Sequence, residues 1–245
     1  PLQKGDFTFQ FSPRFGNVVV ADIQHQNTTI QSSLAVMALQ VDSSAIEWKT
    51  TFPQTGNVFK RFQQYFLAKK LRNNIADLMQ QFGDFMQEDK NIYGLDVQPA
   101  KVTDTMVVTT SMETKDYPSA FDYYSLVQQL KTYIAEKGAQ ETNFPMLNIT
   151  PLQGGGYQAR VAIPVNKELP SSPSISFKRL IPGNILVAEL TGGPQTIERG
   201  LQQLEHFVTE KNFRSPAIPF QLMVTNRLQE QDTSKWITRL YYPVY

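Results

Sequence analysis

The first part of the chain alternates hydrophobic and polar residues with a period of two. The run Asp6-Phe7-Thr8-Phe9-Gln10-Phe11 is the clearest case, and strand-like runs follow at residues 17–23, 34–41 and 45–52. Such alternation is typical of strands that bury one face. We therefore expect an antiparallel sheet over the N-terminal residues.

From Val58 onward the period changes to that of a helix. Hydrophobic residues recur every three to five positions, and we expect them to form one stripe that packs on the sheet: Phe62, Phe66, Leu71, Ile75, Leu78, Phe82 and Phe85. The first half of this helix is basic and the second half acidic, an order that opposes the helix dipole. A lipid or phosphate surface and a solvated face both fit the basic half, and the acidic half favours the solvated face.

The rest of the chain contains one pattern twice. Residues 128–137 return at 202–211 with Gln-Gln-Leu and Glu-Lys unchanged, and with Tyr/Phe and Ile/Val exchanges between them. Pro145 corresponds to Pro219 at the same offset, and Arg160 corresponds to Arg239 at a slightly longer one. Each copy has the pattern strand, helix, strand, strand, which predicts a duplicated β-α-β-β domain with pseudo-two-fold symmetry.

These patterns predict an α+β protein of two domains. An antiparallel sheet plus a long helix occupies residues 1–97, and the duplicated domain occupies 98–245, with repeats at 102–166 and 175–245. The boundary falls in a short connection, residues 91–101, that contains Gly94 and Pro99. A segment rich in proline and serine, residues 169–174, joins the two copies.

Composition removes several classes of function. The formal net charge of +1 argues against a dedicated nucleic-acid binder, so we expect no nucleic-acid partner. Without cysteine there are no disulfides or thiolate nucleophiles, and two histidines, His25 and His206, cannot build a multi-histidine metal centre. We expect neither a metal nor a cofactor, and the oligomeric state stays open.

No apolar run in the sequence is long enough to span a membrane. The chain begins at Pro1 without a methionine, so membrane contact is expected only if an upstream anchor was removed. We therefore expect a cytoplasmic protein.

Residues 102–245 resemble the GyrI-like (gyrase-inhibitor-like) small-molecule-binding domain, which also serves for effector binding in AraC- and MerR-type transcription regulators. The resemblance rests on the duplicated plan together with four motifs: Arg179–Gly183, Gly192-Gly193, Ile218-Pro219-Phe220 and the ending Asp232–Val244. It implies two SHS2-type units whose sheets form a groove for hydrophobic, often cationic, small molecules. The helix-turn-helix of those regulators is absent from this sequence.

Residues 1–97 resemble the closing half of a START-like (SRPBCC) ligand-binding domain. The resemblance rests on strands that end in Ile46-Glu47-Trp48-Lys49-Thr50 and are followed by one long helix. The sequence departs from that family because it has no room for the two short helices with which such folds begin.

Alternation in the second copy assigns its strand residues to two faces. We expect one set to pack under the helices: Leu186, Ala188, Leu190, Phe220, Leu222, Val224, Leu240 and Tyr242. We expect the other set to line a ligand groove: Glu189, Gln221, Met223, Arg239 and Tyr241, with Arg160 as the first copy's counterpart and Trp236 as an aromatic wall. Alternatively, Glu189 and Arg239 pair across neighbouring strands and the aromatic residues belong to the core.

The resemblance places Gln221 at the position of a pocket glutamate that meets cationic ligands. An amide at this position favours a neutral amphipathic ligand. We therefore predict binding, for sensing or sequestration, of an apolar or amphipathic small molecule. Two alternatives stay open: a hydrolase of a strained electrophile, with Glu189 as the candidate general acid or base, and a protein-interaction module. Binding is favoured over catalysis.

Overall fold

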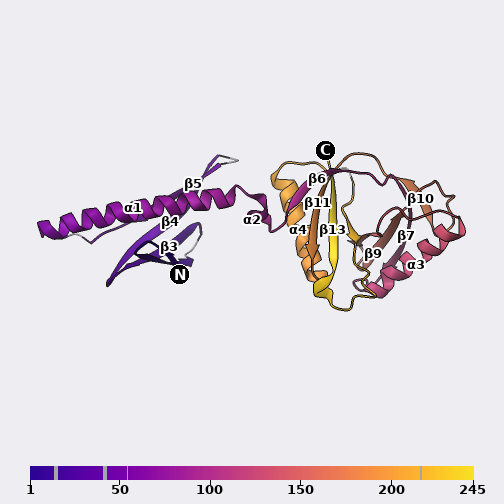
Figure 1. Cartoon of the computed structure of the whole chain (residues 1–245), viewed down its shortest axis with the longest axis horizontal. Helices are drawn as coiled ribbons and strands as arrows, with labels where there is room; N and C mark the ends of the chain where they lie inside the picture. The colour runs from indigo at the N-terminus through magenta and orange to yellow at the C-terminus, as the bar shows by residue number, and fades with distance from the viewer. Residues whose placement is uncertain (14–15, 41–42, 54, 216) are drawn as a thin grey trace. The chain divides into compact units, whose positions relative to one another are not determined.

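The chain folds into two compact units, Pro1–Gln87 and Glu88–Tyr245. A computed structural model describes residues 1–13, 16–40, 43–53, 55–215 and 217–245 (Figure 1). The two units join ten residues before the expected boundary at 97/98. The α+β fold class is confirmed, because each unit combines helices with one antiparallel sheet.

The first unit is a five-stranded meander with one long helix. Its strands are β1 (Leu2–Lys4), β2 (Phe7–Pro13), β3 (Val18–His25), β4 (Thr28–Gln40) and β5 (Ser43–Thr50), and they pair antiparallel in sequence order. Strand β4 begins earlier than expected, and the predicted strand end at Val41 lies outside the described residues. The sheet that alternation predicted is therefore present, with β1 as an additional edge strand.

Helix α1 (Val58–Met86) lies along this sheet. The side chain of Asn57 caps its start by accepting hydrogen bonds from the backbone N–H groups of Phe59 and Lys60. Leu71 is buried against Phe7, Phe9, Ile23 and Ile30, and Leu67, Ile75 and Leu78 pack beside it. The central part of the expected stripe therefore does face the sheet.

Both ends of the expected stripe are wrong. Phe62 and Phe66 are 62% and 64% exposed, and Phe82 and Phe85 are 46% and 52% exposed. A step of five residues, from Phe66 to Leu71, turns an α-helix by about 140° beyond a full turn, so the two side chains point to different sides. Only steps of three or four residues keep a stripe on one face.

The second unit contains the predicted duplication. The first repeat is β7 (Met106–Thr114), α3 (Ala120–Glu136), β8 (Met146–Pro151) and β9 (Tyr157–Pro164). The second is β11 (Asn184–Thr191), α4 (Pro194–Glu210), β12 (Phe220–Met223) and β13 (Ile237–Val244). In the sheet the order β7-β9-β8 is followed by its mirror image, β12-β13-β11, so β8 and β12 meet at the centre. This order is the pseudo-two-fold arrangement that the repeat predicts.

The sheet of each repeat is also extended by one strand that precedes the other repeat in the chain. Strand β6 (Val97–Lys101) precedes the first repeat but pairs with β11 of the second, and β10 (Ser176–Arg179) precedes the second repeat but pairs with β7 of the first. The two segments that follow these strands contact each other, because the Val102 N–H donates to Gly183 and the Leu180 N–H donates to Thr105. Sequence periodicity did not predict this exchange.

Both long helices of the second unit cover the same side of their repeats. Leu130 of α3 and Leu204 of α4 occupy equivalent positions in the duplication, and each is fully buried in the core of its own repeat. Leu186, Ala188, Leu240 and Tyr242 lie under α4, as expected. The hydrophobic core therefore consists of two halves, one for each helix.

A short helix, α2 (Asp89–Tyr93), attaches residues 88–97 to the second unit. The Tyr93 ring packs edge-on against Phe207 with 5.1 Å between centroids, and its hydroxyl donates to the carboxylate of Glu210. Burial and this carboxylate raise the pKa of Tyr93 to about 12. The expected linker is thus a packed part of the second unit.

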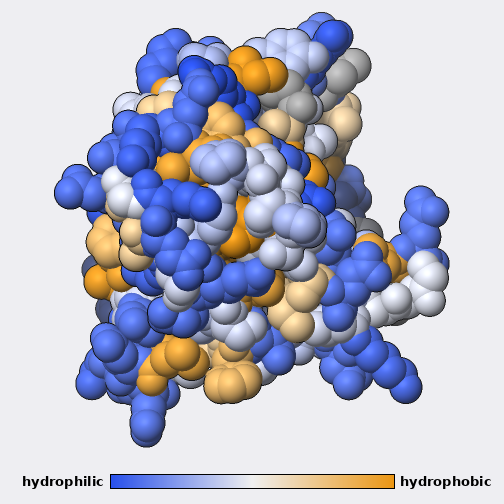
Figure 2. Space-filling model, turned by 90° about the vertical axis from the view of Figure 1, so that its right-hand side faces the viewer, coloured by the Kyte–Doolittle hydropathy of each residue, from blue (hydrophilic) through white to orange (hydrophobic). Residues whose placement is uncertain are grey.

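The end of the second unit that carries α3 and β10 presents mainly hydrophilic side chains, with hydrophobic ones in small separate patches (Figure 2). Within the described residues, no helix combines the length and the apolar character needed to cross a bilayer.

Candidate ligand-binding site

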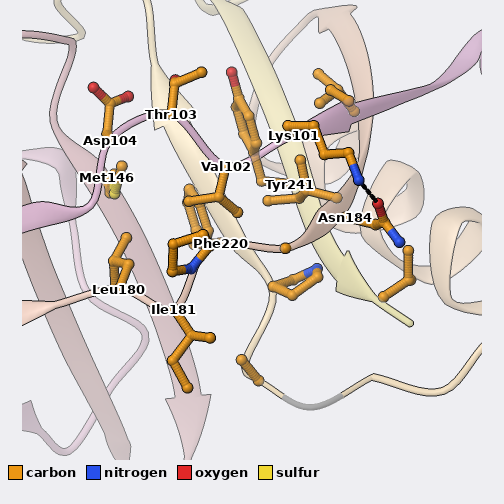
Figure 3. Close-up of a pocket in the computed structure, with 18 of the residues that line it drawn as sticks. Lys101, Val102, Thr103, Asp104, Met146, Leu180, Ile181, Asn184, Phe220 and Tyr241 are labelled. Atoms are coloured by element: carbon orange, nitrogen blue, oxygen red, sulfur yellow. Dashed lines mark hydrogen bonds between the residues drawn. The ribbon is translucent and has the colours of Figure 1, made fainter.

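A cavity of about 680 Å³ lies on the sheet face that the helices leave uncovered. Its floor consists of side chains from three neighbouring strands: Ile185 and Val187 of β11, Phe220 and Leu222 of β12, and Tyr241 and Pro243 of β13. Its opposite wall is formed by the last residues of β6 and β10 and the contacting segments that follow them, residues 101–104 and 179–183 (Figure 3). The strand exchange therefore creates the site.

Strand register explains why these floor residues share a face. Phe220 lies directly opposite Tyr241, and Leu222 lies opposite Arg239. Residues directly opposite each other in an antiparallel pair point to the same side. The rings of Phe220 and Tyr241 are stacked almost in parallel, with centroids 5.1 Å apart. This pair provides a flat aromatic floor.

Apart from the Tyr241 hydroxyl, the polar side chains lie in the wall and rim, where most have partners. The Lys101 ammonium donates to the side-chain oxygen of Asn184 (Figure 3), and Asn143 Nδ2 donates to Asp104 Oδ2 at 2.8 Å. Arg179 forms an ion pair with Glu168. The arrangement suits a mainly apolar ligand whose polar end reaches the rim.

Of the predicted site residues, Tyr241 lines this cavity. Glu189 and Arg239 are on the same sheet face but outside the cavity, where Arg239 Nε donates to Glu189 Oε2 at 2.7 Å. This hydrogen bond raises the pKa of Arg239. The cross-strand pair of Glu189 and Arg239, which the sequence left as an alternative, is therefore present. The carboxylate proposed for acid–base chemistry is engaged in this pair.

The expected face of β12 is wrong. Gln221 pairs with Leu240, which lies under α4, and Met223 is buried in the core beneath α3. Phe220 and Leu222, expected under the helices, instead face the cavity. Residues of β12 do alternate between two faces, but each set lies on the face opposite to the expected one. The expectation failed because the cavity face of this strand is itself apolar.

Trp236 and Arg160 also lie away from the cavity. Trp236 is buried on the helix side, where its Nε1 donates to the Glu230 carbonyl at 2.9 Å. Arg160 lines a separate polar depression beside Ser111 and Lys178, and its Nη2 donates to Gln158 at 2.7 Å. The seven predicted residues thus belong to several different environments.

The sequence reasoning missed the wall of the cavity altogether. Segments 101–104 and 179–183 lack a periodic pattern. Their contact depends on the pairing of β6 with β11 and of β10 with β7, strands that are far apart in the sequence. One signal was present, because Arg179–Gly183 carried part of the family resemblance. Among the described residues, no group of three or more histidine, aspartate and glutamate side chains is placed to hold a metal ion.

Comparison with solved structures shows a likeness to EcmrR. The crystal structure of the EcmrR C-terminal domain is 13% identical, with a TM-score of 0.52, and the match covers 62% of this chain and 98% of that chain. The cryo-EM structure of the EcmrR–DNA complex is 14% identical, with a TM-score of 0.54, and the match covers 77% of this chain and 72% of that chain. No family model and no curated protein matches the sequence. At these identities the likeness concerns the fold, and this fold is consistent with the GyrI-like resemblance.

Proposed function

We propose that the second unit binds an apolar or amphipathic small molecule in the cavity, for sensing or sequestration. The observation that carries this proposal is the cavity itself, a 680 Å³ space with a stacked aromatic floor. Its volume falls in the range of small-molecule sites, which are typically apolar with a few polar groups that orient the ligand. The fold shared with the EcmrR C-terminal domain is compatible with this function.

The rim favours a ligand without a permanent charge. Lys101, Asp104 and Arg179 bring both signs of charge, and each already has a partner within the protein. A charged ligand group would have to replace one of these contacts, whereas a neutral polar group can share them. Asn143 and Asn184, rather than Gln221, supply the amides that such a group would meet.

Among the residues that the structure describes, no specific contact favours the hydrolase alternative, since Glu189 is paired outside the cavity. Membership of the GyrI-like family, the START-like nature of residues 1–97 and a cytoplasmic location stay predictions.

Nile red, a neutral apolar dye, provides a direct test. We expect saturable fluorescence enhancement with the natural protein and at least about tenfold weaker binding with Val187→Trp, a loss of about 1.4 kcal/mol. The larger side chain would fill space above the cavity floor, where Val187 lies.

Leu228→Trp is the matched control, because Leu228 is exposed and does not line the cavity. Circular dichroism should show that both variants fold. Equal dye affinity for Val187→Trp and the natural protein would contradict the proposal.

A further inference from the structure

An arginine is buried on the opposite, helix-covered side of the second unit. Arg227 lies in the segment between β12 and β13 and is 6% exposed. Its Nη2 donates to Gln221 Oε1 at 2.7 Å and to Thr238 Oγ1 at 3.0 Å, and its Nη1 donates to the Tyr123 hydroxyl at 3.2 Å. All three acceptors are uncharged side chains.

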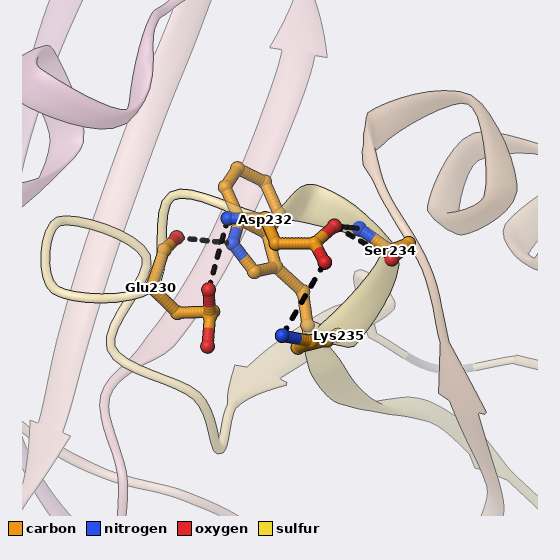
Figure 4. Close-up of polar contacts among 5 residues, drawn as sticks. Glu230, Asp232, Ser234 and Lys235 are labelled. Atoms are coloured by element: carbon orange, nitrogen blue, oxygen red, sulfur yellow. Dashed lines mark hydrogen bonds and ion pairs between the residues drawn. The ribbon is translucent and has the colours of Figure 1, made fainter.

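Two aromatic rings flank this guanidinium. Its central carbon lies 5.7 Å from the ring centroid of Tyr123 and 5.1 Å from that of Trp236. Both distances are within the range of cation–π attraction. The Trp236 ring is fixed by its hydrogen bond to the Glu230 carbonyl, and Asp232 orders the neighbouring turn by accepting from Ser234 and pairing with Lys235 (Figure 4).

Arg227 takes part in none of the ion pairs formed by the described residues, so no carboxylate neutralises its charge. Its Nε is buried and has no acceptor within the described part of the chain. A guanidinium stays protonated in proteins, and a buried charge is costly unless its surroundings compensate for it. Here the compensation comes from aromatic faces and neutral oxygens. This composition suits a flat, delocalised cation.

We call Tyr123, Gln221, Trp236 and Thr238 the arginine cage. Tyr123 belongs to α3 of the first repeat and the other three belong to the second repeat, so the cage lies where the repeats meet.

The backbone of the Arg227 segment is held separately from the guanidinium. The Tyr124 hydroxyl accepts from the Arg227 N–H at 3.0 Å and donates to the Thr225 carbonyl at 3.2 Å. A tyrosine hydroxyl is protonated at neutral pH, and burial raises the pKa of Tyr124 further. The segment therefore has an anchor that survives truncation of the arginine side chain.

We propose that the arginine cage is a binding site for guanidinium-type, flat organic cations and that its resident ligand is the chain's own Arg227. The site is distinct from the apolar cavity on the other face and does not depend on the function proposed for it. A ligand tethered to its site competes at a high effective concentration. Arg227 therefore closes the cage to external cations and links the two repeats.

Chemical rescue tests this assignment, with methylguanidinium as the probe. Arg227→Ala should lower the melting temperature, and millimolar methylguanidinium chloride should raise it again by about 2–4 °C for each kcal/mol of binding. The natural protein should show no such rise, because its cage is filled. Methylammonium chloride at the same concentration controls for ionic strength and for a compact cation.

Arg239→Ala is the matched control variant, since Arg239 is partly exposed and paired with Glu189. It should show no rescue. If Arg227→Ala does not fold alone, refolding by methylguanidinium supports the proposal equally.

Two results would overturn the proposal. One is an Arg227→Ala protein that neither gains stability nor refolds with methylguanidinium. The other is an Arg227→Met protein as stable as the natural one. Such a result would mean that the cage needs only a side chain of this size and not a planar cation.

Discussion

At the scale of single residues, Gln221 makes the shortest of the hydrogen bonds that hold the Arg227 guanidinium. Its amide oxygen accepts at 2.7 Å, and the residue is buried. An amide provides the acceptor geometry that the guanidinium needs but no negative charge. Exchanging the amide for a carboxylate therefore changes the charge of this site while nearly preserving its shape.

Gln221→Glu should raise the free energy of unfolding by about 1 kcal/mol at pH 7, because a charge-assisted hydrogen bond replaces a neutral one. The desolvation of the new carboxylate offsets part of the gain. Arg227 should hold the pKa of this carboxyl below its unfolded value of about 4.3, so the gain is present above that pH and is lost as the pH falls through the folded pKa.

Urea unfolding from pH 3 to 7 measures this effect. Gln221→Leu, which removes the acceptor and leaves the donor unpaired, should instead destabilise by about 1–3 kcal/mol. A Gln221→Glu protein that is less stable than the natural one at pH 7 would show that desolvation outweighs the ion pair.

At the scale of elements, helix α4 packs closely on its sheet at Gly200. A Cβ atom at this position would lie 2.4 Å from Leu190 Cδ2 and 3.1 Å from Leu240 Cδ1. Glycine in a helix interior normally costs about 1 kcal/mol relative to alanine. The close packing of α4 on β11 and β13 therefore depends on a residue that helix propensity disfavours.

Gly200→Ala should lower the free energy of unfolding by about 1–3 kcal/mol, because overpacking exceeds the gain in helix propensity. Gly83→Ala in α1 is the control, since a Cβ there meets no atom of the described residues within 4 Å. This substitution should stabilise the first unit by about 0.5–1 kcal/mol. Differential scanning calorimetry measures both. A stabilising effect of Gly200→Ala would mean that α4 can move away from the sheet without loss.

At the scale of the whole molecule, the division between the units falls at a single exposed turn. Gln87 and Glu88 are exposed, and Glu88 has an extended backbone between α1 and α2. The two linkers expected from composition are both packed. Tyr93 and Leu95 are buried in the first, and the Tyr133 hydroxyl donates to Pro170 in the second.

A glutamate-specific protease should therefore cleave first after Glu88 and release the fragments 1–88 and 89–245. Exposed turns are cut before packed segments and regular elements. Mass spectrometry of the early products identifies the site. Earlier cleavage after Glu168, which precedes the proline- and serine-rich segment, would show that the segment between the repeats is the weaker one.

The sequence by itself determined most of the elements and their order, but not the strands β1, β6 and β10 or the short helix α2. Periodicity predicted the N-terminal sheet, the long helix and the two β-α-β-β copies, because burial of one face imposes a local repeat on each strand and helix. Leu130 and Leu204 could be matched as core residues from the duplication alone, since each copy repeats the same local packing problem.

Only the tertiary structure decided which face of β12 meets a cavity. Phe220 and Leu222 are as hydrophobic as core residues, yet they line the uncovered face, while Gln221 is buried with Arg227. Alternation specifies a period but not a phase when both sides of a strand are shielded from water. The exchange of β6 and β10, which builds the cavity wall, depends on pairing between distant segments, and no local pattern encodes it.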